Sequence, residues 1–296
     1  MRIAVTGGAG FIGSHLVDRL AADGAHDIVV IDNLHRARVA GLPLSSRVSF
    51  REVDIRNREA LLDAIGGCEV VFHLAAQSNV LGAEAHLDYS FSTNVTGTFH
   101  VLTAAKSVGV RRVVFTSSRE VYGDPERTPV EETAPLLPKN AYGASKAAAE
   151  MYCRVLSDNV TVLRLANVYG PGDRGRVIPI FIDNALRGEP LQLYGGEQVV
   201  DFIWVGVVVE ALMRAGFGAW IGEPVNIGSG TGITIRELAT RIVETIGGRS
   251  QLVVMPVREV EVTRFIASTA RAQRLLGIQP PEDPLSHLGE VIRAST

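Results

Sequence analysis

The stretch TGGAGFIG (6–13) follows the apolar run RIAVT (2–6) and precedes a helical pattern that begins near residue 11. Its glycines at positions 7, 10 and 13 have the spacing G-x-x-G-x-x-G. Between a strand and a helix, Gly7 and Gly10 let the backbone turn tightly and approach a pyrophosphate, and Gly13 lets the helix pack close to the sheet. A tight turn without a ligand is the plain alternative. The strand before it and the helix after it favour a dinucleotide site.

Apolar runs alternate with helical patterns through the first half of the chain. The runs are nearly continuous, which is typical of parallel strands buried on both faces. This rhythm predicts an α/β fold, a Rossmann-type doubly wound parallel sheet. We expect strands at 2–6, 27–32, 47–53, 70–75, 111–117 and 160–166, and helices at 11–23, 57–65, 90–108 and 141–157.

The rhythm breaks after residue 167, where a Gly-rich loop (167–176) begins. The second half predicts a smaller mixed α/β lobe at the carboxyl edge of the sheet, where ligands of such sheets bind. We expect a cofactor domain at 1–166 and a substrate lobe at 167–296, with the chain free to cross back. Further helices are expected at 177–187, 205–215, 234–246 and 284–294, and strands at 191–194 and 199–203.

The composition is that of an ordinary globular protein, with 296 residues, 46% hydrophobic and 21% charged. A net charge of −3 gives no reason to expect nucleic acid or an anionic membrane as a partner. No apolar run approaches the ~18 residues of a membrane span. MRIAVTGG enters a strand directly, so we expect no signal peptide and a cytoplasmic location. Cys68 and Cys153 match no metal or redox spacing, and we expect no metal.

Asp32 ends the second expected strand, 19 residues after Gly13 (32 − 13). A carboxylate at this point accepts hydrogen bonds from the ribose hydroxyls of NAD and repels a 2′-phosphate. A turn former at a strand end is the plain alternative, because Asn33 follows. We predict NAD, and Arg36 and Arg38 keep NADP open.

YGASK (142–146) places Tyr142 and Lys146 four residues apart, on one face of an Ala-rich helix. An ammonium beside a phenol stabilises the phenolate and makes it a usable general base near neutral pH. The start of an ordinary amphipathic helix is the plain alternative. The glycine motif and the Ser-Ser pair at a strand end favour the catalytic interpretation.

Together these motifs resemble the extended short-chain dehydrogenase/reductases, and more narrowly their nucleotide-sugar epimerase/dehydratase branch. The resemblance covers nearly the whole chain. It rests on TGGAGFIG, Asp32, DI (54–55), HLAAQ (73–77), Asn94, TSSREVYG (116–123), YGASK, RLANVYGPG (164–172), RGEPLQLYGGEQVVDFIWV (187–205) and VNIGSG (225–230).

The resemblance implies a role for each matching residue. Tyr142 would take the proton from the sugar O4 while hydride leaves C4, with Ser118 on the reacting oxygen and Lys146 beside the phenol. The cofactor would be held by Gly7, Gly10, Phe11, Ile12, Gly13, Asp32, Asn33, Asp54, Ile55, Leu74, Ala75, Ala76, Asn94, Tyr142 and Lys146.

The implied substrate is a nucleotide-diphosphate sugar, most simply a UDP-sugar. It would contact Ser118, Arg119, Asn167, Arg176, Val177 and Arg258. Val200 stands where relatives carry an arginine, so Arg174 or Arg176 substitutes for it or the site is altered. The expected helices 90–108 and 141–157 resemble the pair that forms a dimer interface in the family, so we expect a homodimer.

FTSSREVYG (115–123) decides the reaction that the resemblance implies. Dehydratases and UDP-glucuronate decarboxylases carry a glutamate at the position of Glu120, whereas 4-epimerases carry Ala, Ser or Thr. We therefore expect a dehydratase, in which Glu120 removes the C5 proton after C4 oxidation, water leaves and the hydride returns. Neighbours on a strand point to opposite faces, so both side chains need not enter the site, and we expect Glu120 to be the inward one.

Several alternatives stay open. A 4-epimerase of a UDP-hexose or a UDP-uronic acid shares the oxidation but needs no further base. UDP-glucuronate decarboxylase and a non-catalytic NAD-binding regulator are further alternatives. Glu120 could form an ion pair with Arg119 and do no chemistry. Arg119 cannot act as an acid at neutral pH, but it would suit a substrate carboxylate.

Overall fold

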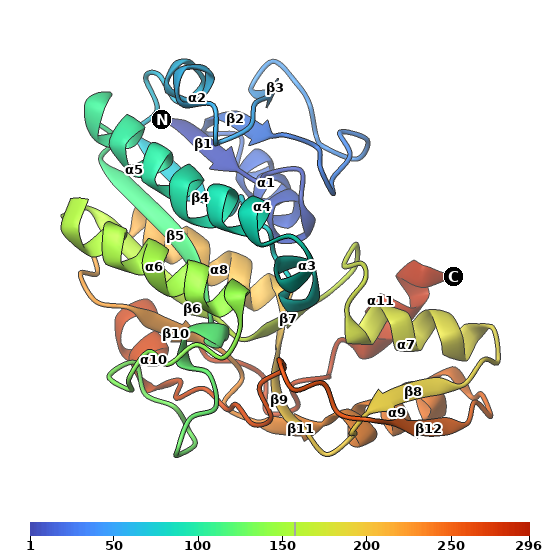
Figure 1. Cartoon of the computed structure of the whole chain (residues 1–296). Coiled ribbons are helices and arrows are strands. Elements are labelled where there is room, and N and C mark those ends of the chain that lie inside the picture. Colours follow the sequence, from blue (N-terminus) through green and yellow to red (C-terminus); the bar gives the residue numbers. More distant parts are fainter. Residues whose placement is uncertain (157) are drawn as a thin grey trace.

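The computed structural model describes residues 1–156 and 158–296, so the last residue of the expected helix 141–157 lies outside the described residues. A parallel sheet of seven strands forms the centre of the molecule, in the order β10-β6-β5-β4-β1-β2-β3 (Figure 1). The Rossmann-type fold is thereby confirmed. The strands are β1 (Arg2–Thr6), β2 (Asp27–Asp32), β3 (Val48–Glu52), β4 (Val70–His73), β5 (Arg112–Ser118), β6 (Val160–Leu165) and β10 (Val225–Ile227).

Helices cover both faces of this sheet because successive strand residues point to opposite sides. In β1, Ile3 and Val5 join the apolar cluster that includes α1 (Phe11–Ala22) and α8 (Val205–Phe217). Ala4 joins the cluster on the other face, which includes α2 (Arg58–Ala64), α5 (Thr98–Ser107) and α6 (Ala141–Leu156). Near-continuous apolar strands are therefore buried on both sides, as the sequence predicts.

The expected helix 90–108 is divided. Helix α4 (Leu87–Phe91) leads into a π-helical segment, η1 (Ser92–Gly97), before α5 begins. Helix α3 (Val80–Ala85), which the sequence does not predict, lies just before it. Such a widened turn changes the direction of the side chains that it carries, and it is often found near functional sites.

The second part of the molecule packs around its own apolar cluster. Its strands form a sheet in the order β11-β9-β7 and a parallel pair, β12-β8. The strands are β7 (Asn167–Tyr169), β8 (Leu191–Tyr194), β9 (Val199–Trp204), β11 (Gly232–Thr234) and β12 (Leu252–Met255), and the helices are α7 (Val177–Leu186), α9 (Ile235–Ile246) and α11 (Leu288–Ser295).

The chain returns to the large sheet after residue 167. Helix α8 covers one face of that sheet, β10 extends its edge beside β6, and α10 (Ala270–Leu276) packs against them. The division at residues 166 and 167 stays a prediction. Within the described ranges, no helix has the length and apolar character needed to cross a membrane.

Candidate active site

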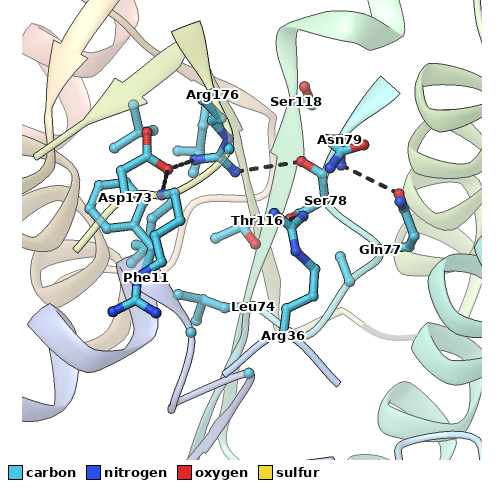
Figure 2. A pocket seen from close by; sticks show the side chains of 18 of the residues that line it. Phe11, Arg36, Leu74, Gln77, Ser78, Asn79, Thr116, Ser118, Asp173 and Arg176 are labelled. Carbon is cyan, nitrogen blue, oxygen red and sulfur yellow. Dashed lines mark hydrogen bonds and ion pairs between the residues drawn. The ribbon is translucent and has the colours of Figure 1, made fainter. Parts of the chain in front are cut away.

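A cleft of about 980 Å³ lies between the carboxyl ends of the large sheet and the second lobe. Figure 2 shows part of its wall. Most residues that the sequence singles out line this cleft, although they are far apart in the chain. They are Gly7, Gly10, Phe11, Ile12, Gly13, Asp32, Asn33, Ile55, Leu74, Ala75, Ala76, Ser118, Arg119, Glu120, Tyr142, Lys146, Asn167, Arg176, Val177 and Arg258.

Asp54 and Asn94 do not line the cleft. Burial alone would raise the pKa of Asp54, but hydrogen bonds from Arg56 and Asn33 outweigh it and lower the pKa to about 2. The Asn94 side chain is buried and donates to the Ser145 hydroxyl over 2.9 Å, while it accepts from the Gln77 N–H over 2.8 Å. Both residues therefore form hydrogen bonds with residues next to the cleft but do not line it themselves.

The glycine turn leaves a cradle that a larger residue would fill. Gly7 has φ +71°, and a Cβ there would lie 2.6 Å from Ala75 N. A Cβ on Gly13 would lie 2.1 Å from the Gly7 carbonyl oxygen. Gly10 precedes α1, whose free N–H groups attract phosphate oxygens. The backbone of this turn can thus come close to a diphosphate.

Asp32 completes the cofactor end of the cleft. Its carboxylate accepts from Leu34 N over 2.9 Å and from Ala9 N over 3.2 Å, which ties the end of β2 to the glycine turn. Burial raises the pKa of Asp32, and these backbone hydrogen bonds oppose the rise. The cradle and the carboxylate together fit a dinucleotide.

Ser118, Tyr142 and Lys146 meet at the centre of the cleft. Ser118 is the last residue of β5, and Tyr142 and Lys146 lie in the first turns of α6. Asn140 caps that helix, because its side-chain oxygen accepts from Gly143 N over 2.8 Å. The Lys146 ammonium donates to the Thr116 carbonyl oxygen over 2.9 Å. Two separate elements therefore hold the three side chains in place.

The charge state of these groups follows from their surroundings. Burial raises the pKa of the Tyr142 phenol, and the negative charge of Glu120 adds to the rise. The positive charges of Arg176 and Arg119 lower this pKa, as does a hydrogen bond with Ser118. Burial also lowers the pKa of Lys146 to about 8, against the influence of Cys153 and Glu150. Once deprotonated, a Tyr142 oxygen so placed can accept a proton from a substrate hydroxyl, with the Lys146 charge favouring the phenolate and the Ser118 hydroxyl as a hydrogen-bond partner.

Arg119 and Glu120 correct one prediction. Strand β5 ends at Ser118, and residues Arg119–Tyr122 form a 3₁₀ turn, so the alternation of a strand does not apply to them. Their side chains do not point to opposite faces, because Arg119 Nη2 lies 2.7 Å from Glu120 Oε1. Asn140 Nδ2 donates to the other carboxylate oxygen, Glu120 Oε2, over 2.8 Å. Both carboxylate oxygens of Glu120 are thus engaged.

Three arginines of the second lobe line the cleft: Arg174, Arg176 and Arg258. Arg176 pairs with Asp173 (3.1 Å) and donates to the Ser78 carbonyl oxygen over 3.5 Å, as Figure 2 shows. Arg258 lies 3.5 Å from the centre of the Tyr194 ring. Val200 is buried among apolar side chains of β9 and its neighbours. These three arginines can therefore contact a phosphate group in the cleft, whereas the apolar Val200 cannot pair with one.

Sequence reasoning misses three residues around this site: Asn140, Glu150 and Arg164. Asn140 stands directly before an Ala-rich helix, which is a capping signal. Glu150 lies on α6, two turns beyond Tyr142. Arg164 is a charged residue inside the apolar run VTVLRLA (160–166). A buried arginine needs a partner of opposite charge, so this position predicts a buried ion pair. Across the described ranges, no group of His, Cys, Asp and Glu could hold a metal ion.

Residues 3–228 match the family model "NAD dependent epimerase/dehydratase family". A UDP-glucose 4-epimerase of Mycolicibacterium smegmatis is 38% identical over 95% of this chain and 94% of its own length. The structure of a UDP-glucose 4-epimerase from Thermotoga maritima with UDP-glucose superposes with a TM-score of 0.92, at 34% identity and 99% coverage of both chains. The dTDP-glucose 4,6-dehydratase DesIV of Streptomyces venezuelae, with NAD bound, superposes with a TM-score of 0.94, at 33% identity, 99% of this chain and 96% of the other.

Proposed function

This chain belongs to the NAD-dependent epimerase/dehydratase family, and from this premise we propose that it is a 4-epimerase of a UDP-hexose or a UDP-hexuronic acid. Its cofactor is NAD, which when bound accepts a hydride from the sugar C4 and returns it. The glycine cradle and Asp32 would hold that cofactor. The substrates named for the epimerase relatives, and the arginines at the cleft, support a nucleotide-diphosphate sugar as the partner.

The observation that carries the proposal is the state of the Glu120 carboxylate. A base for the C5 proton needs a free carboxylate oxygen directed at the sugar. In this chain one oxygen pairs with Arg119 and the other accepts from Asn140. Glu120 is only 5% exposed, so water cannot easily replace either partner. These two contacts of the Glu120 carboxylate support a 4-epimerase rather than the dehydratase that the sequence suggests.

The chain's own groups would carry the proton steps. The Tyr142 oxygen would take the O4 proton during oxidation. It would give the proton back after the 4-keto sugar has rotated in the site and presents its other face to the cofactor. The Ser118 hydroxyl would bind the same oxygen and orient it. Lys146 would stabilise the phenolate by its charge. No step needs a base for the C5 proton, so the engaged Glu120 carboxylate is no obstacle.

Incubation with UDP-glucose, UDP-galactose, UDP-glucuronic acid and dTDP-glucose in deuterated water tests this proposal. We expect products of unchanged mass with inverted C4 and without deuterium at C5, read by NMR and mass spectrometry. UDP-glucuronic acid belongs in the panel because Arg119 Nη1 has no partner among the described residues. Loss of water with deuterium at C5 would establish a dehydratase instead, and loss of carbon dioxide a decarboxylase.

The same panel with Glu120→Gln separates the two roles of this carboxylate. We expect epimerisation to persist, within about tenfold of the unchanged enzyme, because the step needs no carboxylate base. Glu261→Gln is a matched control, since Glu261 also lines the cleft and pairs with an arginine, Arg258 (3.0 Å). If the unchanged enzyme eliminates water from the sugar and Glu120→Gln does not, although it still oxidises C4, Glu120 is the base for the C5 proton.

An exposed apolar face on α4, α5 and α6 supports a homodimer. Figure 1 shows α5 and α6 running side by side on the outside of the sheet. Val155 is 79% exposed on this face and Phe91 61%, an unusual exposure for side chains of this kind. A second copy, presenting the same helices, would bury such a face by two-fold symmetry. Phe99, Met151 and Tyr152 are also exposed on these helices.

Light scattering coupled to gel filtration tests this assembly. We expect twice the mass of one chain for the unchanged protein, and a single-chain mass for the Met151→Glu/Val155→Glu variant, since two buried carboxylates would oppose pairing. Leu275→Glu is the control, because Leu275 is exposed on α10, away from this face. A single-chain mass for the unchanged protein would refute the homodimer.

A further inference from the structure

A buried ion pair lies directly beneath the catalytic groups. Glu150, on α6, is 4% exposed, and Arg164, on β6, is 5% exposed. The guanidinium meets the carboxylate with two nitrogens, Nε on Oε1 at 3.0 Å and Nη2 on Oε2 at 2.7 Å. Two-point contact of this kind fixes orientation as well as distance. Helix α6 is therefore held at a set position against the sheet.

The pair reaches the end of β5, which carries Ser118, and the turn that carries Arg119 and Glu120. The Ser117 hydroxyl donates to Glu150, and Ser117 is the residue before Ser118. Arg164 Nη1 donates to the Tyr122 hydroxyl over 2.8 Å, and Tyr122 closes the turn that carries Arg119 and Glu120. The Tyr122 hydroxyl in turn donates to Asn226 Oδ1 over 2.7 Å. One buried network thus connects the end of β5, the turn and α6.

We propose that Glu150 and Arg164 are positioning residues of this active site, which fix Ser118 against Tyr142 and keep Lys146 in its charged form. Glu150 follows Lys146 by one helical turn, so the two side chains lie on the same face of α6. The inference rests on the proposed function only where it gives Lys146 a role in catalysis.

The charge on Lys146 needs a nearby anion because the ammonium is buried. Among the residues that the structure describes, it donates one hydrogen bond, to the Thr116 carbonyl, and it lies 4.8 Å from the Phe115 ring centre. A buried ammonium without an anion loses its proton. The contacts around Lys146 therefore decide whether it stays charged at neutral pH.

The titratable groups that face Lys146 leave Glu150 as that anion. On α6, burial raises the pKa of Cys153, and burial also raises that of Tyr142, so both are neutral near pH 7. On β4, burial and Lys146 lower the pKa of His73 to about 3, so its ring is neutral. On β6, Arg164 adds a positive charge that weakens the field of Glu150, and on the 3₁₀ turn Arg119 and Glu120 cancel each other.

The lysine content of the chain makes a direct measurement practical. Only three lysines occur: Lys106, Lys139 and Lys146. Protein labelled with ¹³Cε-lysine would show three signals in an NMR pH titration, and Lys146→Ala would identify the buried one. We expect the Lys146 signal to titrate near pH 8, and Glu150→Gln to move this midpoint down by roughly one unit or more.

Changing the other partner should move the midpoint in the opposite direction. Arg164→Met leaves the Glu150 charge uncompensated, so the ammonium of Lys146 is held more strongly and the midpoint rises. Arg164→Lys keeps the charge and should stay near the unchanged protein, as should Ser117→Ala, which removes one neutral hydrogen bond. If Arg164→Met does not fold, Glu150→Gln/Arg164→Met removes both charges and should lower the midpoint, as Glu150→Gln does.

The activity profile gives a second readout that a purely structural role would not move. We expect the alkaline limb of kcat to shift with the NMR midpoint of Lys146, with KM for the UDP-sugar nearly unchanged. An unmoved midpoint in Glu150→Gln, with only a lower melting temperature, would overturn the inference and leave a structural ion pair. Because the titration needs no substrate, it stands apart from any failure of the epimerase proposal.

Discussion

Tyr142→Phe is expected to lower kcat for C4 inversion by about 10²- to 10⁴-fold, the range that a positioned general base contributes. In its deprotonated form the Tyr142 side chain can take a proton from a sugar hydroxyl, with Ser118 hydrogen-bonded to it and Lys146 on the same helix face. Phenylalanine keeps the ring and its packing and removes only the oxygen. The loss should therefore appear in kcat, with a smaller effect on KM.

Tyr152→Phe is the matched control for this prediction. Tyr152 lies on the same helix, α6, but is 42% exposed on its outer side. We expect its kcat to stay close to that of the unchanged enzyme, and both variants to retain NAD, measured by fluorescence titration. A Tyr142→Phe enzyme with more than about a tenth of normal activity would mean that another group takes the O4 proton.

The central sheet could be predicted because its signals are local. Apolar runs such as DIVVID (27–32) become strands at or near the expected bounds, and TGGAGFIG leads into α1 as its spacing requires. The three-residue strands β7, β10 and β11 could not be predicted, because three residues carry no periodicity. They are strands only because longer neighbours pair with them.

The motifs pick out residues that the structure brings together at one cleft, but not the contacts that connect them. The side-chain directions of Arg119 and Glu120 depend on where β5 ends. The strand ends at Ser118, and Arg119 already belongs to a 3₁₀ turn. Sequence patterns locate the end of a strand only within a few residues. The ion pair of Glu150 with Arg164 joins a helix to a strand across a loop, and no spacing rule links the two.

The same limit applies at Val200, where the sequence departs from its family pattern. The family resemblance implies that an arginine is missing there, but not what takes its place. The structure places Val200 in the apolar cluster of the second lobe, and Arg176 and Arg258 at the cleft. Its neighbour Asp201 points the other way along β9 and is completely buried.

Asp201 connects three segments of the chain. Its carboxylate accepts from the Ser229 N–H and hydroxyl (both 2.7 Å), from Ala267 N (3.0 Å) and from Gly230 N (3.1 Å). These donors lie after β10 and before α10, so β9 is joined to both.

Asp201→Ala is therefore expected to lower the free energy of unfolding by at least about 2 kcal/mol, since the two buried N–H groups of Ser229 and Ala267 each lose their acceptor at ~1–3 kcal/mol, and the partly buried N–H of Gly230 loses its acceptor too. Urea unfolding followed by circular dichroism measures the loss. Asp201→Asn keeps one acceptor oxygen and the volume of the side chain, so its loss should be smaller. Because Val200 and Gln198 of this segment line the cleft, Asp201→Ala should also raise KM for the UDP-sugar more than it lowers kcat. Equal stability of Asp201→Ala and the unchanged protein would show that water or a shifted backbone satisfies these donors.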